Sequence, residues 1–215
     1  MKLDKSIDKK YRDSVEDALD TIIANGTDEQ RRIATLIRES EMEIRVQPVS
    51  VIRASGVTGL IDPSATTEKI AEERLSLKEA LGEVYIAVAE ETIDTGGQRG
   101  CEGTLVHEGR HAYDFARMIE SYSKADTNPL SVYDPTLYEL EWNAHMISGE
   151  YMLCINKDDY LDEGLQLMIL GRDTESLSCF VDNEGIRQRL RESYGLERSK
   201  NEGPLSSKLF GLSLA

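Results

Sequence analysis

The chain has 215 residues, of which 40% are hydrophobic and 30% charged, and its formal net charge is −15 at pH 7. A chain of this length and composition can bury one sizeable hydrophobic core, which argues against an intrinsically disordered protein. The negative charge disfavours nucleic-acid backbones and anionic membranes as partners, because both carry charge of the same sign.

The sequence also carries signals about the cellular compartment. No stretch approaches the roughly 20 apolar residues of a membrane span, and the first residues, Met-Lys-Leu-Asp-Lys-Ser, lack the apolar core of a signal peptide. The three cysteines, Cys101, Cys154 and Cys179, form no metal-spaced pair and predict reduced thiols. We therefore expect a cytoplasmic protein, with a non-classical export route left open.

The segment before residue 90 contains both helical and strand patterns. Apolar residues at helical spacing predict three helices, at residues 6–24, 28–39 and 67–81. Alternating or continuous apolar runs predict strands at residues 43–53, 57–61 and 84–89. Pro48 lies inside the first of these runs and indicates a sheet edge or a bulge there, because proline cannot donate a backbone hydrogen bond.

The next segment contains the sequence His107-Glu108-Gly109-Arg110-His111, which has the pattern H-E-x-x-H in a chain with only three histidines. Side chains four positions apart in an α-helix project from the same face. His107 and His111 could therefore hold one Zn²⁺ from one side. Glu108 would lie beside the metal, where it can take a proton from a metal-bound water.

The residues around this motif predict the helix that it requires. Glycines between residues 96 and 103 predict a flexible lead-in, and Thr104 is a suitable N-cap. Gly109 lowers helix propensity by about 1 kcal/mol relative to alanine, but it leaves room for a substrate or a neighbouring strand. Asp114 shares the histidine face, and it either orients a histidine by accepting a ring N–H or is a solvated acidic residue. Cys101 could bring a thiolate near a metal, although a plain free cysteine is the simpler interpretation.

A catalytic zinc ion usually has three protein ligands and a water, so a third ligand is needed from another element. Asp134 followed by Pro135 predicts the start of a second helix. Glu141 and His145 lie four apart on that helix, beside its apolar stripe. We expect Glu141 to be the third ligand, with His145 and Glu139 as alternatives by ligand type and spacing.

Residues 84–153 resemble the gluzincin-type zinc metallopeptidases of the thermolysin-like zincin clan. In that group H-E-x-x-H is followed on a later helix by a glutamate within E-x-x-A-[DH] or E-x-x-x-D. The matching positions here are His107, Glu108 and His111, then Glu141 with Ala144 and His145. This chain departs from the group at His145, where an aspartate that hydrogen-bonds a ligand histidine is common. His145 could act as a partner of the metal ligands, stabilise a substrate oxyanion or replace Glu141.

The resemblance implies an α+β, zincin-like fold with a small mixed sheet packed on the motif helix and on a following ligand-bearing helix. In such enzymes an edge strand above the cleft pairs with an extended substrate, and the strands between residues 46 and 89 are candidates for it. We expect a single domain over residues 1–200 with its core at 43–153, further helices near 158–170 and 184–194, and a loosely ordered tail at 201–215.

The functional expectation is a zinc peptidase with one Zn²⁺ per chain that hydrolyses a peptide or protein amide bond. Glu108 would be the general base, and the oxyanion would need a donor opposite the metal. Candidate donors are His145, Tyr133, Tyr138 and Tyr151. Two alternatives stay open: a non-catalytic zinc-binding regulatory or interaction module, and an acidic partner-binding protein in which the motif is accidental.

Overall fold

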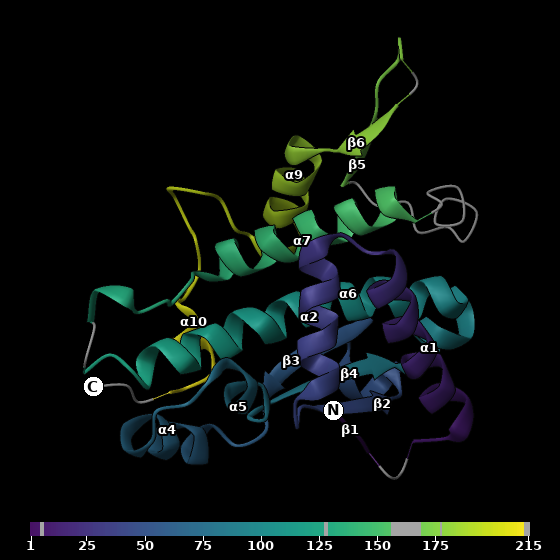
Figure 1. The fold of residues 1–215 in the computed structure, drawn as a ribbon. Coiled ribbons are helices and arrows are strands. Elements are labelled where there is room, and N and C mark those ends of the chain that lie inside the picture. The colour runs from purple at the N-terminus through teal and green to yellow at the C-terminus, as the bar shows by residue number, and fades with distance from the viewer. Residues whose placement is uncertain (5–6, 127–128, 156–168, 177, 213–215) are drawn as a thin grey trace.

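The computed structural model describes residues 1–4, 7–126, 129–155, 169–176 and 178–212 (Figure 1). Its described part is a mixed α+β fold built on a four-stranded sheet of order β1-β2-β4-β3. The strands are β1 (Lys2–Leu3), β2 (Glu43–Gln47), β3 (Gly56–Leu60) and β4 (Val84–Ala89). The first three strands of that order are parallel, whereas β3 is antiparallel to β4 and lies at the sheet edge. The predicted α+β class is therefore confirmed.

Two helices before the sheet form where the apolar periodicity predicts them. Helix α1 (Lys9–Asn25) ends at Gly26, and α2 (Asp28–Glu39) begins with a capping box in which Thr27 and Gln30 exchange side-chain and backbone hydrogen bonds. Both helices bury their apolar stripes against α6 (Glu90–Tyr122), the longest helix (Figure 1). A capping box satisfies backbone N–H groups that the first helical turn leaves unpaired.

Two of the predicted elements between residues 43 and 81 are interrupted. The strand expected over 43–53 ends at Gln47, because Pro48 begins the short helix α3 (Val49–Ile52). The prediction of a single helix over residues 67–81 is also wrong. The segment contains two helices, α4 (Pro63–Glu72) and α5 (Leu77–Leu81), because a capping box at Ser76 starts a new helix.

Helix α6 starts directly after β4 and contains the histidine motif. The expected flexible lead-in with Thr104 as N-cap is wrong, because residues 90–103 are already helical apart from a kink at Gly97, whose φ is 56°. Helix α7 (Leu137–Cys154) follows the short 3₁₀ helix η1 (Pro129–Ser131) and packs along α6 (Figure 1). Its N-cap is Thr136, not Asp134, and Glu139 completes the capping box.

The C-terminal part contains a hairpin of β5 (Leu170–Arg172) and β6 (Cys179–Val181), then α9 (Asn183–Tyr194) and α10 (Ser206–Leu209). The β5–β6 hairpin and α9 cover α7 on the side away from the sheet, whereas α10 packs on α6 (Figure 1). Helix α9 confirms the helix predicted near 184–194. The helix predicted near 158–170 falls mostly outside the described residues, and Leu170 belongs to β5. No helix in the described part is long and apolar enough to cross a membrane.

The tail was expected to be loosely ordered, but its described residues are tied to the start of α7. The backbone N–H of Leu137 donates to the carbonyl of Pro204, and that of Tyr138 donates to Glu202. Ser206 donates to the carbonyl of Pro135 through both its backbone N–H and its hydroxyl. The prediction is wrong for residues 201–212, because these long-range hydrogen bonds leave no local pattern in the sequence.

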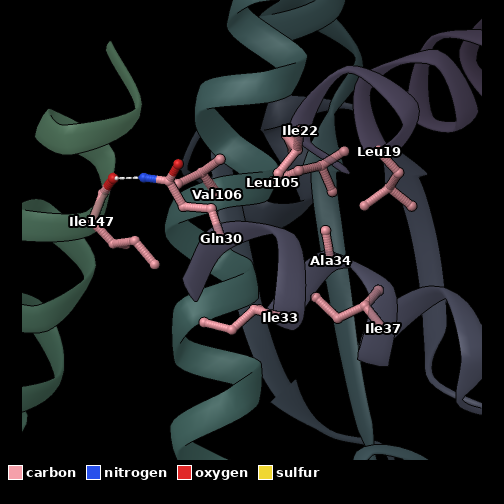
Figure 2. A pocket seen from close by; sticks show the side chains of 9 residues that line it. All are labelled: Leu19, Ile22, Gln30, Ile33, Ala34, Ile37, Leu105, Val106 and Ile147. Atoms are coloured by element: carbon pink, nitrogen blue, oxygen red, sulfur yellow. Dashed lines mark hydrogen bonds between the residues drawn. The ribbon is translucent and has the colours of Figure 1, made fainter. Parts of the chain in front are cut away.

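A buried glutamine links α2 to α7 across the face of α6. The Gln30 side chain is 2% exposed and donates to the carbonyl of Ile147 over 2.9 Å (Figure 2). Around it, apolar side chains from α1, α2, α6 and α7 leave a cavity of about 10 Å³, room for at most one water. The cavity is lined by Leu19, Ile22, Gln30, Ile33, Ala34, Ile37, Leu105, Val106 and Ile147. This interior is a packing contact and not a ligand site.

We predict that Gln30→Ala lowers the free energy of unfolding by about 1–3 kcal/mol, because it removes a buried side-chain hydrogen bond to the Ile147 carbonyl and half of the α2 capping box. Urea unfolding measures the change. The control is Gln188→Ala, which removes an exposed glutamine that donates a hydrogen bond to the Glu192 side chain. Equal stability losses in the two variants would contradict the proposed link.

Candidate metal centre

The two motif histidines meet on one face of α6. Their Nε2 atoms are 3.2 Å apart, and the rings are nearly perpendicular, with an interplanar angle of 86°. Both side chains are mostly buried, with exposed fractions of 19% for His107 and 9% for His111. The predicted pairing of these histidines on one helix face is therefore present in the structure.

Glu141 reaches this pair from α7, where the buried Ala144 allows the two helices to pack closely. Its Oε1 lies 3.5 Å from His111 Nε2, and its Oε2 lies 3.7 Å from His107 Nε2. Ligand atoms on a tetrahedral zinc ion are separated by about 3.3 Å, given bonds of about 2.0–2.1 Å. The three donors, which all lie within 4.8 Å of one another, could therefore hold one metal ion.

The protonation of two of these donors, His111 and Glu141, also suits a cation. Burial acts to lower the pKa of His107, but its interactions with Glu141 and Glu108 raise it, so a metal ion would replace a proton on this ring. Burial, assisted by the charge of His107, lowers the pKa of His111 to about 3, so its imidazole is neutral at pH 7. Burial acts to raise the pKa of Glu141, but its interaction with His107 and the other histidines lowers it to about 2. Within the described part of the chain, the buried Oε2 of Glu141 has no hydrogen-bond partner. A buried ionised carboxylate oxygen without a partner is costly, and a bound cation would compensate it.

His145 lies beside these three donors. Its ring centroid is 4.9 Å from that of His107, and its Nε2 is 3.9 Å from Glu141 Oε2. Burial lowers the pKa of His145 to about 3, which makes it a neutral imidazole at pH 7. The alternative ligand Glu139 is engaged as the α7 cap. Cys101 is fully buried, and its thiol donates to the carbonyl of Ser14.

Glu108 is held between α6 and the edge strand β3. The Thr58 hydroxyl lies 2.7 Å from Glu108 Oε2 and 3.1 Å from its backbone carbonyl. Gly56 lets the strand approach, since a Cβ at this position would lie 2.7 Å from Glu108 Cγ and 2.5 Å from Thr104 Cγ2. Burial raises the pKa of Glu108, although His107 and the Thr58 hydrogen bond oppose this effect.

Gly109 and Asp114, both on α6 near the histidines, have structural partners that the sequence did not indicate. Asp114, fully buried, forms a two-contact ion pair with Arg110 and accepts a hydrogen bond from Tyr133, so it neither orients a histidine nor is solvated. Gly109 faces α2, where a Cβ would lie 3.1 Å from Ile37 Cδ1. The space at Gly109 is therefore taken by a helix, not by a substrate or a strand.

A cleft of about 310 Å³ opens beside the histidines and Glu108. Its lining includes His107, Glu108 and His145 together with Arg99, Arg189 and Tyr194. The last two come from α9 and were missed, because no local motif marks them.

None of the three candidate tyrosines lines this cleft. Tyr133 bonds Asp114, Tyr151 bonds Glu102, and Tyr138 stacks on Trp142. Tyr194 is the tyrosine that lines it. Burial, followed by the negative charge of Glu141, raises the pKa of Tyr194, so its hydroxyl keeps its proton.

The chain matches no family model, no curated protein and no solved structure. The resemblance to gluzincin peptidases therefore stays a prediction. The function of the chain is therefore inferred from the geometry of the residues described above.

We predict that Glu141→Ala abolishes tight Zn²⁺ binding, because it removes one of three donors that converge on a single point. His145→Ala should weaken Zn²⁺ binding less, by about 10–100-fold, as expected for a partner next to the ligands. Titration with Zn²⁺ against a competing chelator measures both affinities. The matched control is Glu139→Gln, on the same helix, which should bind like the parent. A greater loss in His145→Ala than in Glu141→Ala would show that a third histidine replaces the glutamate.

Proposed function

We propose that the protein is a zinc-dependent peptidase of the gluzincin type on a zincin-like fold, with one Zn²⁺ per chain. The observation that carries this proposal is the position of Glu108. Its carboxylate lies at the cleft, on the same helix as the two histidines and beside a group of donors that could hold a metal. A purely structural metal site has no use for a base at this position.

Zinc suits the donor set, because two imidazoles and one carboxylate are the ligands of many catalytic zinc sites. When bound there, it would lower the pKa of a coordinated water towards about 7 and polarise a substrate carbonyl. His107, His111 and Glu141 would hold it. Three protein ligands leave one position for water or substrate, as a catalytic site requires.

Glu108 would accept the proton of the attacking water and deliver it to the nitrogen of the leaving amine. Its buried environment strengthens this role, because a carboxylate with a raised pKa is a stronger base near neutral pH. The Thr58 hydroxyl holds Oε2 and fixes the orientation of the carboxylate. Glu108 could then exchange its proton through Oε1.

The oxyanion formed at the carbonyl carbon needs donors on the cleft wall. His145 and Tyr194 are suited to this role, because both line the cleft and their rings lie 6.5 Å apart. The neutral imidazole of His145 carries one N–H. The Tyr194 hydroxyl keeps its proton because its pKa is raised. Tyr194 thus takes the place of the three tyrosines considered from the sequence.

An extended peptide or protein segment is the proposed substrate. Strand β3 lies at the sheet edge, and Ser55 and Gly56 at its start line the cleft. Within the described residues β3 pairs with β4 alone, so its other edge offers main-chain groups for strand addition. Among the strands between residues 46 and 89, β3 is therefore our choice for the substrate-pairing edge.

A second candidate is a non-catalytic zinc module in which His145 closes a four-ligand site. Its Nε2 lies 3.9 Å from Glu141 Oε2 and has no hydrogen-bond partner among the described residues. Structural zinc sites have four protein ligands and no open position. The zinc affinity of His145→Ala separates the two candidates. If His145 is a fourth ligand, this substitution should weaken zinc binding as severely as Glu141→Ala does.

We predict that Glu108→Gln retains zinc and fold but loses amide hydrolysis by about a hundredfold or more, because it keeps the shape of the side chain and removes the base. Fluorogenic casein measures hydrolysis, and metal analysis measures zinc content. Glu120→Gln, near the end of the same helix and paired with Lys124, should behave like the parent. Full activity in Glu108→Gln would refute the proposed base.

Gly56→Ala tests whether β3 positions the base. The added methyl would overlap Thr104 and Glu108, so the strand and the Glu108 carboxylate must shift relative to each other. We expect at least about a tenfold loss of hydrolysis with zinc affinity unchanged, since small displacements of a catalytic group are costly. The control is Gly96→Ala, whose methyl would meet no atom within 4 Å. Parent-like activity in Gly56→Ala would show that β3 does not position Glu108.

A further inference from the structure

We propose that Arg189 is a carboxylate-binding residue of the cleft, so that the preferred substrates carry a carboxylate near the bond that is cleaved. The carboxylate could belong to an aspartate or glutamate side chain or to the free C-terminus of a peptide. This inference deepens the proposed function and relies on it for the substrate class.

The position of Arg189 places its charge at the site. It lies on α9 and lines the same cleft as His107, Glu108 and His145. The ring of Tyr194, on the same helix and in the same cleft, lies 6.5 Å from that of His145, so this part of α9 lies beside the histidines. A substrate placed against Glu108 would therefore lie within reach of Arg189.

Arg189 also differs from the other arginines nearby in having no anionic partner. Its Nε is buried without a hydrogen-bond partner, and no carboxylate of the described residues forms a salt bridge with it. Arg99, in the same cleft, pairs with the fully buried Glu102, and Arg187, on the same helix, pairs with Glu184. Among the described residues, Arg189 is therefore a cleft cation without a carboxylate partner, and a substrate could supply one.

The chemistry of arginine selects the class of partner. A guanidinium presents a planar fork of donors that matches the two oxygens of a carboxylate, and such paired contacts are stronger than neutral hydrogen bonds. The net charge of −15 would repel an acidic peptide at long range. That repulsion is largely screened beyond about 8 Å at physiological ionic strength, so the close contact with Arg189 decides.

The test uses four pools of N-acetylated octapeptides that are randomised over the same uncharged residues. One residue of each peptide is Asp in two pools and Asn in the other two, and each kind is made with a C-terminal acid and with a C-terminal amide. Binding is measured by equilibrium dialysis against zinc-loaded Glu108→Gln protein, with mass spectrometry of the retained peptides. Cleavage by the zinc-loaded parent is measured as newly formed amine.

We expect at least one carboxylate-bearing pool to be retained about tenfold better than the Asn-amide pool, a ratio typical of a charge-assisted contact. A preference for Asp-amide identifies a side-chain carboxylate, and a preference for Asn-acid identifies the C-terminus. Adding Arg189→Gln should reduce the ratio to below about twofold. Arg189→Lys, which keeps the charge without the fork, should reduce it partly. Adding Arg191→Gln, the same charge change at an exposed site on α9, should leave it unchanged.

The proposal would be overturned if all four pools were retained equally, or if none of them were retained. An equal loss of all pools in Arg189→Gln would also overturn it, because that result indicates a general role without selectivity. The proposed function fails separately: carboxylate-dependent retention without cleavage supports the role of Arg189 and contradicts the peptidase. Cleavage of all pools at the same rate supports the peptidase and contradicts the role of Arg189.

Discussion

The close packing of α7 against α6 is the constraint on which the candidate site depends. The two histidines come from one helix, and their third partner, Glu141, comes from the other, so the donor group exists only where the helices meet. Ala144 is fully buried on α7, and its small side chain permits this approach. The tail contacts at residues 202–207 hold the start of α7, and the Gln30 contact to Ile147 holds its C-terminal half.

The site concentrates buried polar groups that the protein itself does not fully satisfy. The Oε2 of Glu141 and the Nε2 of His145 have no hydrogen-bond partner within the described chain. Each such group costs about 1–3 kcal/mol when it is left unpaired in the interior. Elsewhere in α6 the charges of Arg110 and Asp114 compensate each other in an ion pair, whereas Gln98 Nε2 and Glu102 Oε1 are also buried without a partner in the described chain. The unpaired atoms of Glu141 and His145 are groups that a bound cation could compensate.

The fold could be predicted from the sequence where local patterns coincide with tertiary packing. Helix α2 and strand β4 formed as the periodicity predicts, because their apolar residues are buried in the core. The prediction was wrong where a residue that caps a new helix interrupts a periodic segment, as at Pro48 and Ser76. It failed again at residues 201–212, whose order comes from hydrogen bonds to a segment far away in the chain.

Helix geometry alone determined that His107 and His111 share a face, because residues four apart in a helix must do so. Ligand chemistry then left Glu141, His145 and Glu139 as partners. The tertiary structure set Glu139 apart, because it caps α7, and brought the carboxylate of Glu141 up to both histidines, with His145 beside them. Arg189 and Tyr194 could not be found from the sequence. They reach the cleft only because α9 packs on α7, and no spacing along the chain encodes that contact.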